Sequence, residues 1–186
     1  MNCHIWFLSI LLLAVLTPTS GNAQVSTNTE QWHIFKPGKP GSFSVILVPS
    51  KTNYISGKPI NLHILVKNVG SEEADAAFNY SVTLYDVSVT TTNGLNVPPT
   101  THGKQHISNS RTGGSATNTG FKPGETKVTS ADYPLSELYD LSSPNTYKIK
   151  VARRFPIGLD NTKNATIWEK VISNEIEITV VPPPAK

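Results

Sequence analysis

The sequence predicts an all-β protein, built as an antiparallel β-sandwich of about seven to nine strands in one domain. Three observations support this prediction. Apolar and polar residues alternate with a period of two in several segments, which is typical of strands with one buried face. Turn-forming residues separate these segments. No stretch has the convincing periodicity of an amphipathic helix.

The expected strands lie between residues 43 and 182. They cover 43–48, 60–67, 78–92, 126–133, 147–155 and 176–180. The alternation is clearest where large apolar residues occupy the even positions from Ile60 to Val66. Pro49 ends the first strand, Asn93-Gly94 indicates a hairpin turn, and the prolines that begin at Pro182 end the last strand.

The first residues predict export from the cytoplasm. Residues 1–23 contain no charged side chain, and their apolar run over 5–16 is too short to span a bilayer. We expect a signal peptide cleaved after Ala23, so that the protein is secreted or periplasmic. An uncleaved anchor is the alternative. The one cysteine, Cys3, lies in this segment, which leaves the mature chain without thiol nucleophiles or thiolate metal ligands.

Three further segments are expected to lie outside the packed strands. Residues 24–42 form a polar N-terminal leader, and residues 183–186 form a C-terminal tail. Residues 100–120 contain one large aliphatic side chain, Ile107, among many small polar ones. Such a segment buries too little apolar surface to offset its ordering entropy, so it is expected to be a mobile polar loop.

The charge distribution argues against nucleic acid as a partner. The formal net charge is +3, and the basic residues are interleaved with acidic ones. Nucleic-acid binders usually gather basic residues on one face. We therefore expect no nucleic-acid partner, and no membrane span after signal cleavage.

The stretch from Pro134 to Val151 poses the question of an acid/base site. Glu137 and Asp140 lie three residues apart, with no basic partner nearby in the sequence, so they are expected to face water. Leu135, Leu138 and Leu141 have the spacing of a single helical or 3₁₀ turn that packs on the core. We interpret the stretch as scaffold.

Tyr147 follows this turn at the start of an expected strand. It comes two residues after Asn145, a residue type that tolerates the left-handed conformation. This is the pattern of a tyrosine corner, in which the hydroxyl of a tyrosine bonds to upstream backbone in an immunoglobulin-like sandwich. Tyr147, Leu138, Leu141 and Asn145 are therefore assigned structural roles.

Three motifs resemble bacterial extracytoplasmic immunoglobulin-like domains, including the cell-adhesion-related type. They are VKNVGSEEA over 66–74, DLSSPNTYKIKVAR over 140–153 and VISNEIEITVV over 171–181. The resemblance covers residues 43–182 apart from the polar loop, and Asn145 stands where such domains usually have Gly. It implies a fold and not an activity. A family of bacterial proteinase inhibitors has a similar sandwich.

The best candidate for partner binding follows the expected strand 147–155. Phe155, Ile157 and Leu159 are large apolar residues among turn formers, and at a loop tip they would be exposed to a partner. The alternative is that they fold back as a cap over the end of the sandwich. Trp168 is expected in the core.

A basic stripe on the same strand is the second candidate. Lys148, Lys150 and Arg154 share one face, but Glu175 and Glu177 on the expected neighbouring strand can pair with the lysines. Arg154 is then left over, and we add it to the candidate partner-binding residues.

Catalytic, metal and cofactor sites are not expected. The sequence has none of the common hydrolase, phosphate-binding or dinucleotide-binding motifs. His102 and His106 have helical metal-ligand spacing, but Gly103 argues against a helix and no third ligand is evident. We predict a non-catalytic domain that binds a protein or cell-surface partner through its end loops. The alternatives are a proteinase inhibitor, acting through 100–120 or the Phe155 loop, and a structural subunit of an envelope assembly.

Overall fold

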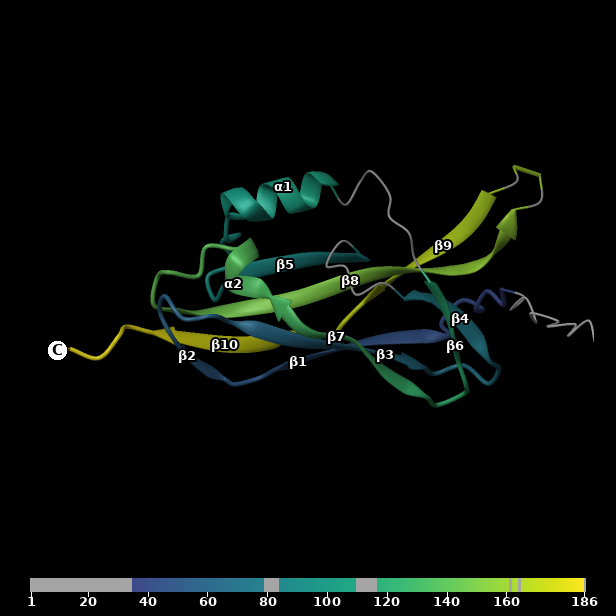
Figure 1. Ribbon diagram of the computed structural model, residues 1–186, viewed down its shortest axis with the longest axis horizontal. Coiled ribbons are helices and arrows are strands. Elements are labelled where there is room, and N and C mark those ends of the chain that lie inside the picture. The colour runs from purple at the N-terminus through teal and green to yellow at the C-terminus, as the bar shows by residue number, and fades with distance from the viewer. Residues whose placement is uncertain (1–34, 79–83, 110–116, 161, 164, 186) are drawn as a thin grey trace, which may run out of the picture. The chain divides into compact units, whose positions relative to one another are not determined.

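The computed structural model describes residues 35–78, 84–109, 117–160, 162–163 and 165–185, and in them the protein is mostly β (Figure 1). The strands are β1 (Phe43–Pro49), β2 (Asn53–Ile55), β3 (Asn61–Asn68), β4 (Ala74–Phe78), β5 (Tyr85–Thr91), β6 (Thr117–Phe121), β7 (Thr126–Pro134), β8 (Asn145–Asp160), β9 (Ala165–Ile172) and β10 (Ile176–Val181). The helices are α1 (Thr101–Asn109) and the short α2 (Leu135–Leu138). The all-β prediction is confirmed. The predicted signal peptide lies outside the described residues.

The first sheet has the strand order β1-β3-β7, with antiparallel neighbours. β3 alternates as predicted, since Leu62, Ile64 and Val66 are buried while the residues between them are partly exposed. Its register with β7 shifts on both sides of Ile64. This irregularity leaves the Ile64 carbonyl to accept a hydrogen bond from the Thr129 hydroxyl, at 3.1 Å.

The second sheet has the strand order β2-β10-β8-β5, and β9 pairs with β8. The pairs are antiparallel except that β2 runs parallel to β10. β8 is 16 residues long and pairs with β10 along its first part and with β9 along its second part. Between β9 and β10, Asn174 bonds the backbone of Leu47 in β1 at both its N–H and its carbonyl. This side chain therefore ties the two sheets together.

Phe43, the first residue of β1, is buried between the sheets. Its ring stacks on Phe155 of β8, with centroids 4.6 Å apart, and meets Phe121 of β6 edge-on at 5.8 Å. β6 pairs with β4 in a separate two-stranded sheet. One aromatic cluster thus joins elements of all three described sheets.

The turn that contains α2 has the predicted structural geometry. Leu135, Leu138 and Leu141 are buried in the core. Tyr147 donates its hydroxyl hydrogen to the Ser143 carbonyl at 2.6 Å, which is the bond of a tyrosine corner. Asn145 begins β8, and its side-chain oxygen accepts a hydrogen bond from the Thr146 N–H.

The prediction of a loop throughout residues 100–120 is wrong, because 101–109 form α1 and 117–120 belong to β6. Thr100 caps α1, since its hydroxyl oxygen accepts a hydrogen bond from the Gly103 N–H at 3.0 Å. Gly103 permits close packing, because an added Cβ would lie 2.0 Å from the Leu138 carbonyl oxygen of α2. Tertiary contact therefore outweighs the polar composition of this segment. Residues 110–116 lie outside the described residues.

Part of the predicted leader is hydrogen-bonded to β4 and β8. Lys36 and Asp75 of β4 exchange two bonds, at 2.6 and 2.7 Å, and the Gly38 N–H donates to the Pro156 carbonyl. Neither described helix is long and apolar enough to cross a membrane.

Candidate functional site

The structure separates the residues predicted to form an apolar loop tip. Phe155 is fully buried, Ile157 is half-buried, and Leu159 is 61% exposed. The expectation that Phe155 is exposed is wrong, because β8 continues to Asp160 and Phe155 keeps the inward alternation that begins at Tyr147. Arg154, on the opposite face of the strand, is exposed as expected.

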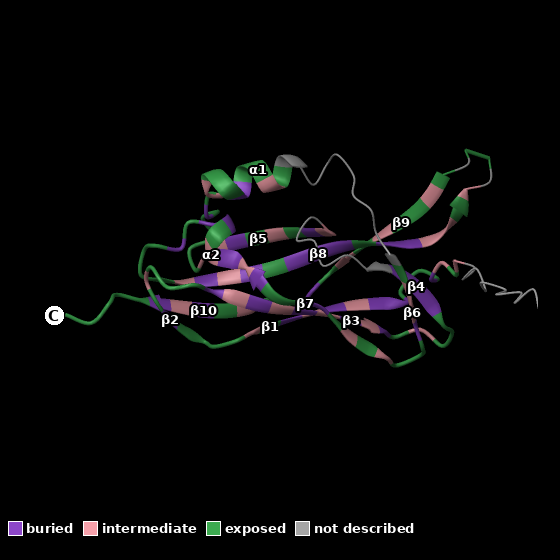
Figure 2. Ribbon diagram, in the orientation of Figure 1, coloured by how far each residue is buried: buried purple, intermediate pink, exposed green. Residues whose placement is uncertain are grey.

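β9 carries exposed apolar side chains that sequence reasoning missed. Ile167 is 45% exposed, Trp168 is 52% exposed and Ile172 is 61% exposed, so the expectation that Trp168 lies in the core is wrong. Figure 2 shows buried residues along most of β8, with exposed ones at the hairpin tip and along much of β9. The high content of β-branched and aromatic residues over 165–172 was the available signal for a strand.

Four exposed residues share one side of the hairpin that β8 and β9 form. The register pairs Arg154 with Lys170, Pro156 with Trp168, and Ala152 with Ile172. Directly opposed residues of an antiparallel pair point to the same face. We call the surface formed by Arg154, Trp168, Lys170 and Ile172 the hairpin face.

The hairpin face is positively charged. Lys170 forms an ion pair with Asp86 of β5 at 3.2 Å. Arg154 has no ion pair among the described residues, and it lies opposite another cation. Nearer the start of β8, Lys148 and Lys150 pair with Glu175 and Glu177 at 2.9–3.9 Å, as the sequence predicts. The unneutralised charge is therefore at the end of the sheet that also exposes Trp168.

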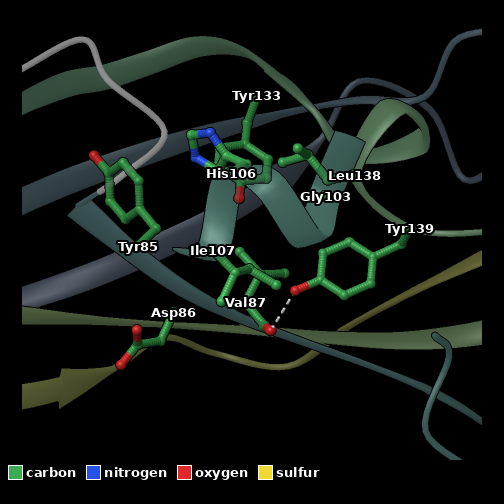
Figure 3. Close-up of a pocket in the computed structure, with 9 residues that line it drawn as sticks. All are labelled: Tyr85, Asp86, Val87, Gly103, His106, Ile107, Tyr133, Leu138 and Tyr139. Atoms are coloured by element: carbon green, nitrogen blue, oxygen red, sulfur yellow. Dashed lines mark hydrogen bonds between the residues drawn. The ribbon is translucent and has the colours of Figure 1, made fainter. Parts of the chain in front are cut away.

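A cavity of about 140 Å³ lies between α1 and the strands beside it (Figure 3). It is lined by Tyr85, Asp86, Val87, Gly103, His106, Ile107, Tyr133, Leu138 and Tyr139. The Nε2 atom of His106 is buried and has no hydrogen-bond partner among the described residues. Tyr139 donates its hydroxyl hydrogen to the Val87 carbonyl at 2.7 Å. The cavity thus combines aromatic walls with one unsatisfied polar atom.

Tyr133 and Tyr139, which line the cavity, remain neutral phenols under ordinary conditions. Burial raises the pKa of Tyr133, and the nearby phenols of Tyr139 and Tyr85 raise it further. Burial also raises the pKa of Tyr139, with a smaller contribution from the Asp86 carboxylate. These groups therefore act as hydrogen-bond donors and not as anions.

Behind the cavity, a chain of hydrogen bonds crosses between the two sheets. Arg153 of β8 donates to the Tyr85 hydroxyl at 3.3 Å, and that hydroxyl donates to Thr129 of β7 at 2.5 Å. Arg153 is buried, and its guanidinium lies 4.9 Å from the Phe155 ring centroid. Burial lowers the pKa of Arg153, while its hydrogen bond to Tyr85 opposes this change. The position of Arg153 in a buried network points to a structural role.

One serine–histidine contact was also missed by sequence reasoning. The Ser50 hydroxyl lies 3.2 Å from His63 Nε2, and it can also donate to the Asn61 carbonyl at 3.3 Å. The described residues place no carboxylate within 4.0 Å of the His63 ring. A nucleophilic triad needs such an orienting group, so this pair lacks one of its elements.

His102 and His106 gain no third metal ligand from the described residues. The two residues do lie on one helix, contrary to the argument from Gly103, but the described residues contain no group of three or more metal-binding side chains. His102 is exposed, whereas His106 lines the cavity.

No protein-family model matches the chain, and a search of curated proteins finds no match.

Proposed function

We propose that the chain is a non-catalytic, extracytoplasmic immunoglobulin-like domain that binds a protein partner through the hairpin face. The observation that carries this proposal is the joint exposure of Trp168 and Ile172 beside the uncompensated charge of Arg154. Export rests on the predicted signal peptide, and the binding partner would lie in the envelope or on a cell surface.

The immunoglobulin-like assignment is supported by the topology and by two short motifs. The strand orders β1-β3-β7 and β2-β10-β8-β5, with β2 parallel to β10, are compatible with such a sandwich. Within VKNVGSEEA, the Asn68 side chain bonds the Glu72 and Phe121 carbonyls and accepts from the Gly70 N–H. Within VISNEIEITVV, Asn174 joins the sheets at Leu47. Both motifs therefore have a structural explanation.

The binding proposal is supported by the kind of residue that is exposed. Tryptophan and arginine are enriched among the residues that dominate the energy of protein interfaces. Trp168 is 52% exposed, so part of its apolar indole ring is in contact with water. Ile172 lies on the same face, two cross-strand residue pairs away. An apolar patch with a cationic neighbour fits a partner that offers an apolar pocket rimmed by carboxylates.

A proteinase-inhibitor function is less favoured by the arrangement of the two segments that would carry it. Inhibition by substrate mimicry needs an extended loop, whereas 101–109 are helical and the Phe155 segment is part of a paired strand. A structural subunit that adds a strand from a partner would use a free sheet edge instead of the hairpin face.

The experiment is affinity capture from an envelope extract with matched variants of the full chain. Trp168→Ser and Ile172→Ser together should abolish capture of a partner that the unsubstituted protein retains. Val69→Ser and Leu95→Ser are the control, because both side chains are at least half exposed but lie elsewhere. Equal capture by the two double variants would refute the proposal. Arg154→Glu should weaken binding more at low salt than at high salt, since rim charges are screened.

A further inference from the structure

We propose that the cavity beneath α1 is a binding site for a small, uncharged, single-ring aromatic molecule that carries one hydroxyl or N–H group, with phenol as the simplest example. This site shares no residue with the hairpin face, although Lys170 of that face pairs with Asp86 of the lining, and it does not depend on the function proposed above.

The size of the cavity fits one ring. Its volume is about 140 Å³. An engineered protein cavity of about 150 Å³ lined by apolar side chains binds benzene, which sets the scale. Tyr85, Tyr133 and Tyr139 supply aromatic walls, and Val87, Ile107 and Leu138 supply aliphatic ones (Figure 3). Such a lining favours a flat apolar ligand.

His106 supplies the polar contact that selects among such ligands. Its Nε2 atom is buried and lacks a hydrogen-bond partner among the described residues. A buried polar atom in that condition is unfavourable, and a turn of the imidazole that brings this atom to a ligand group in the cavity removes the penalty. In one tautomer Nε2 accepts from a ligand hydroxyl, and in the other it donates to the ligand oxygen. A phenol satisfies either case, whereas toluene satisfies neither.

The charges around the cavity disfavour an anionic ligand. Asp86 is the acidic residue of the lining, and its carboxylate is held by Lys170 at 3.2 Å. The phenols of Tyr133 and Tyr139 stay protonated because burial raises their pKa. Among the described residues, no lysine or arginine lines the cavity to balance a carboxylate ligand. Benzoate should therefore bind more weakly than phenol, although the two have similar rings.

The backbone of the first turn of α1 is held in place before any ligand arrives. Thr100 caps the helix at Gly103 and donates its hydroxyl hydrogen to the Glu137 carbonyl at 2.5 Å, and the Thr100 N–H bonds the Leu138 carbonyl at 3.0 Å. Gly103 lies against Leu138 so closely that no side chain fits between them. These contacts hold the first turn of α1, and His106 and Ile107 follow in the next turn. Preorganisation of this kind lowers the entropy cost of binding.

The test is an NMR titration of the full chain with phenol, toluene and benzoate as probes. Phenol should give saturable shifts at the His106 imidazole nitrogens and at the Tyr133 and Ile107 amides. Toluene should bind at least about tenfold more weakly, and benzoate should give no saturable shift. The variant His106→Phe keeps a ring and removes the nitrogen, so it should bind phenol no better than toluene.

The control is His102→Phe, one turn earlier on the exposed part of α1, which should keep the preference for phenol. If His106→Phe does not fold, the phenol-to-toluene ratio of the unsubstituted protein decides the question alone. Equal affinity for phenol and toluene, or no saturable shift with either at millimolar concentration, would overturn the proposal. The hairpin variant with Trp168→Ser and Ile172→Ser should bind phenol normally, so the two proposals fail independently.

Discussion

Replacement of Phe155 by alanine tests whether this residue of β8 belongs to the core. The ring is fully buried, stacks on Phe43 with centroids 4.6 Å apart, and lies 4.9 Å from the guanidinium of Arg153. Truncation of a core phenylalanine costs about 3–5 kcal/mol. Arg153 would also lose an aromatic neighbour in a buried site, so we expect the upper part of that range.

Urea denaturation, followed by circular dichroism, measures this change as a shift of the midpoint at constant slope. The matched variant is Leu159→Ala, four residues along β8, where the side chain is 61% exposed. Its free energy of unfolding should change by no more than about 0.5 kcal/mol. A loss below about 1 kcal/mol for Phe155→Ala would show that the ring is not part of the core, and would restore the prediction of an exposed loop tip.

Three other predictions address the scaffold. Tyr147→Phe removes the 2.6 Å bond to the Ser143 carbonyl and should lower the free energy of unfolding by about 1 kcal/mol; an unchanged urea midpoint would contradict the tyrosine corner. Gly103→Ala places a Cβ 2.0 Å from the Leu138 carbonyl oxygen, so α1 must move. We expect the free energy of unfolding to fall by about 1–3 kcal/mol and the amides of α1 to exchange faster. An unaltered exchange rate would refute this packing. Burial raises the pKa of Tyr133 and Tyr139. Their neutral forms therefore stabilise the fold in full below the unfolded pKa of about 10, and this stabilisation is lost as the pH rises through the folded pKa values. Unfolding midpoints should therefore fall above about pH 10, and less steeply in Tyr133→Phe; a flat profile would contradict the buried position of these phenols.

The sequence predicted the parts of the fold in which local pattern and tertiary environment agree. β3 and β10 alternate in the sequence and are buried on one face in the structure. The leucines around α2 and the bond of Tyr147 also follow their predicted pattern. In each case a single periodicity, or a residue with one suitable partner, determines the outcome.

Predictions failed where a distant contact overrides local composition. Gly103 and the polar residues near it argue against a helix, but the cap at Thr100 and the close approach to Leu138 stabilise one. The strand was expected to end at Phe155, yet β8 continues to Asp160, and the parity from Tyr147 to Phe155 already indicated that Arg153 and Phe155 face inward. The cavity could not be predicted, since its lining comes from segments that are distant in the sequence.

The candidate site was predicted only in part. Arg154 and Leu159 are exposed as expected, whereas the apolar contribution of β9 depends on the pairing of Trp168 with Pro156 and of Ile172 with Ala152. The pairing of Trp168 with Pro156 lies in the extension of β8 beyond the expected end at Phe155, and the pairing of Ile172 with Ala152 needs the strand β9, which was not expected.

The most direct test of the proposed function is site-specific photo-crosslinking in the envelope of the producing cell. A photoreactive residue is introduced in place of Ile172 in one protein and in place of Leu95 in another, because both side chains are strongly exposed but only the first is on the hairpin face. We predict one discrete crosslinked protein from position 172, lost when Trp168→Ser is added, and none from position 95. The same products from both positions, or none from position 172, would contradict the claim that this face binds a partner.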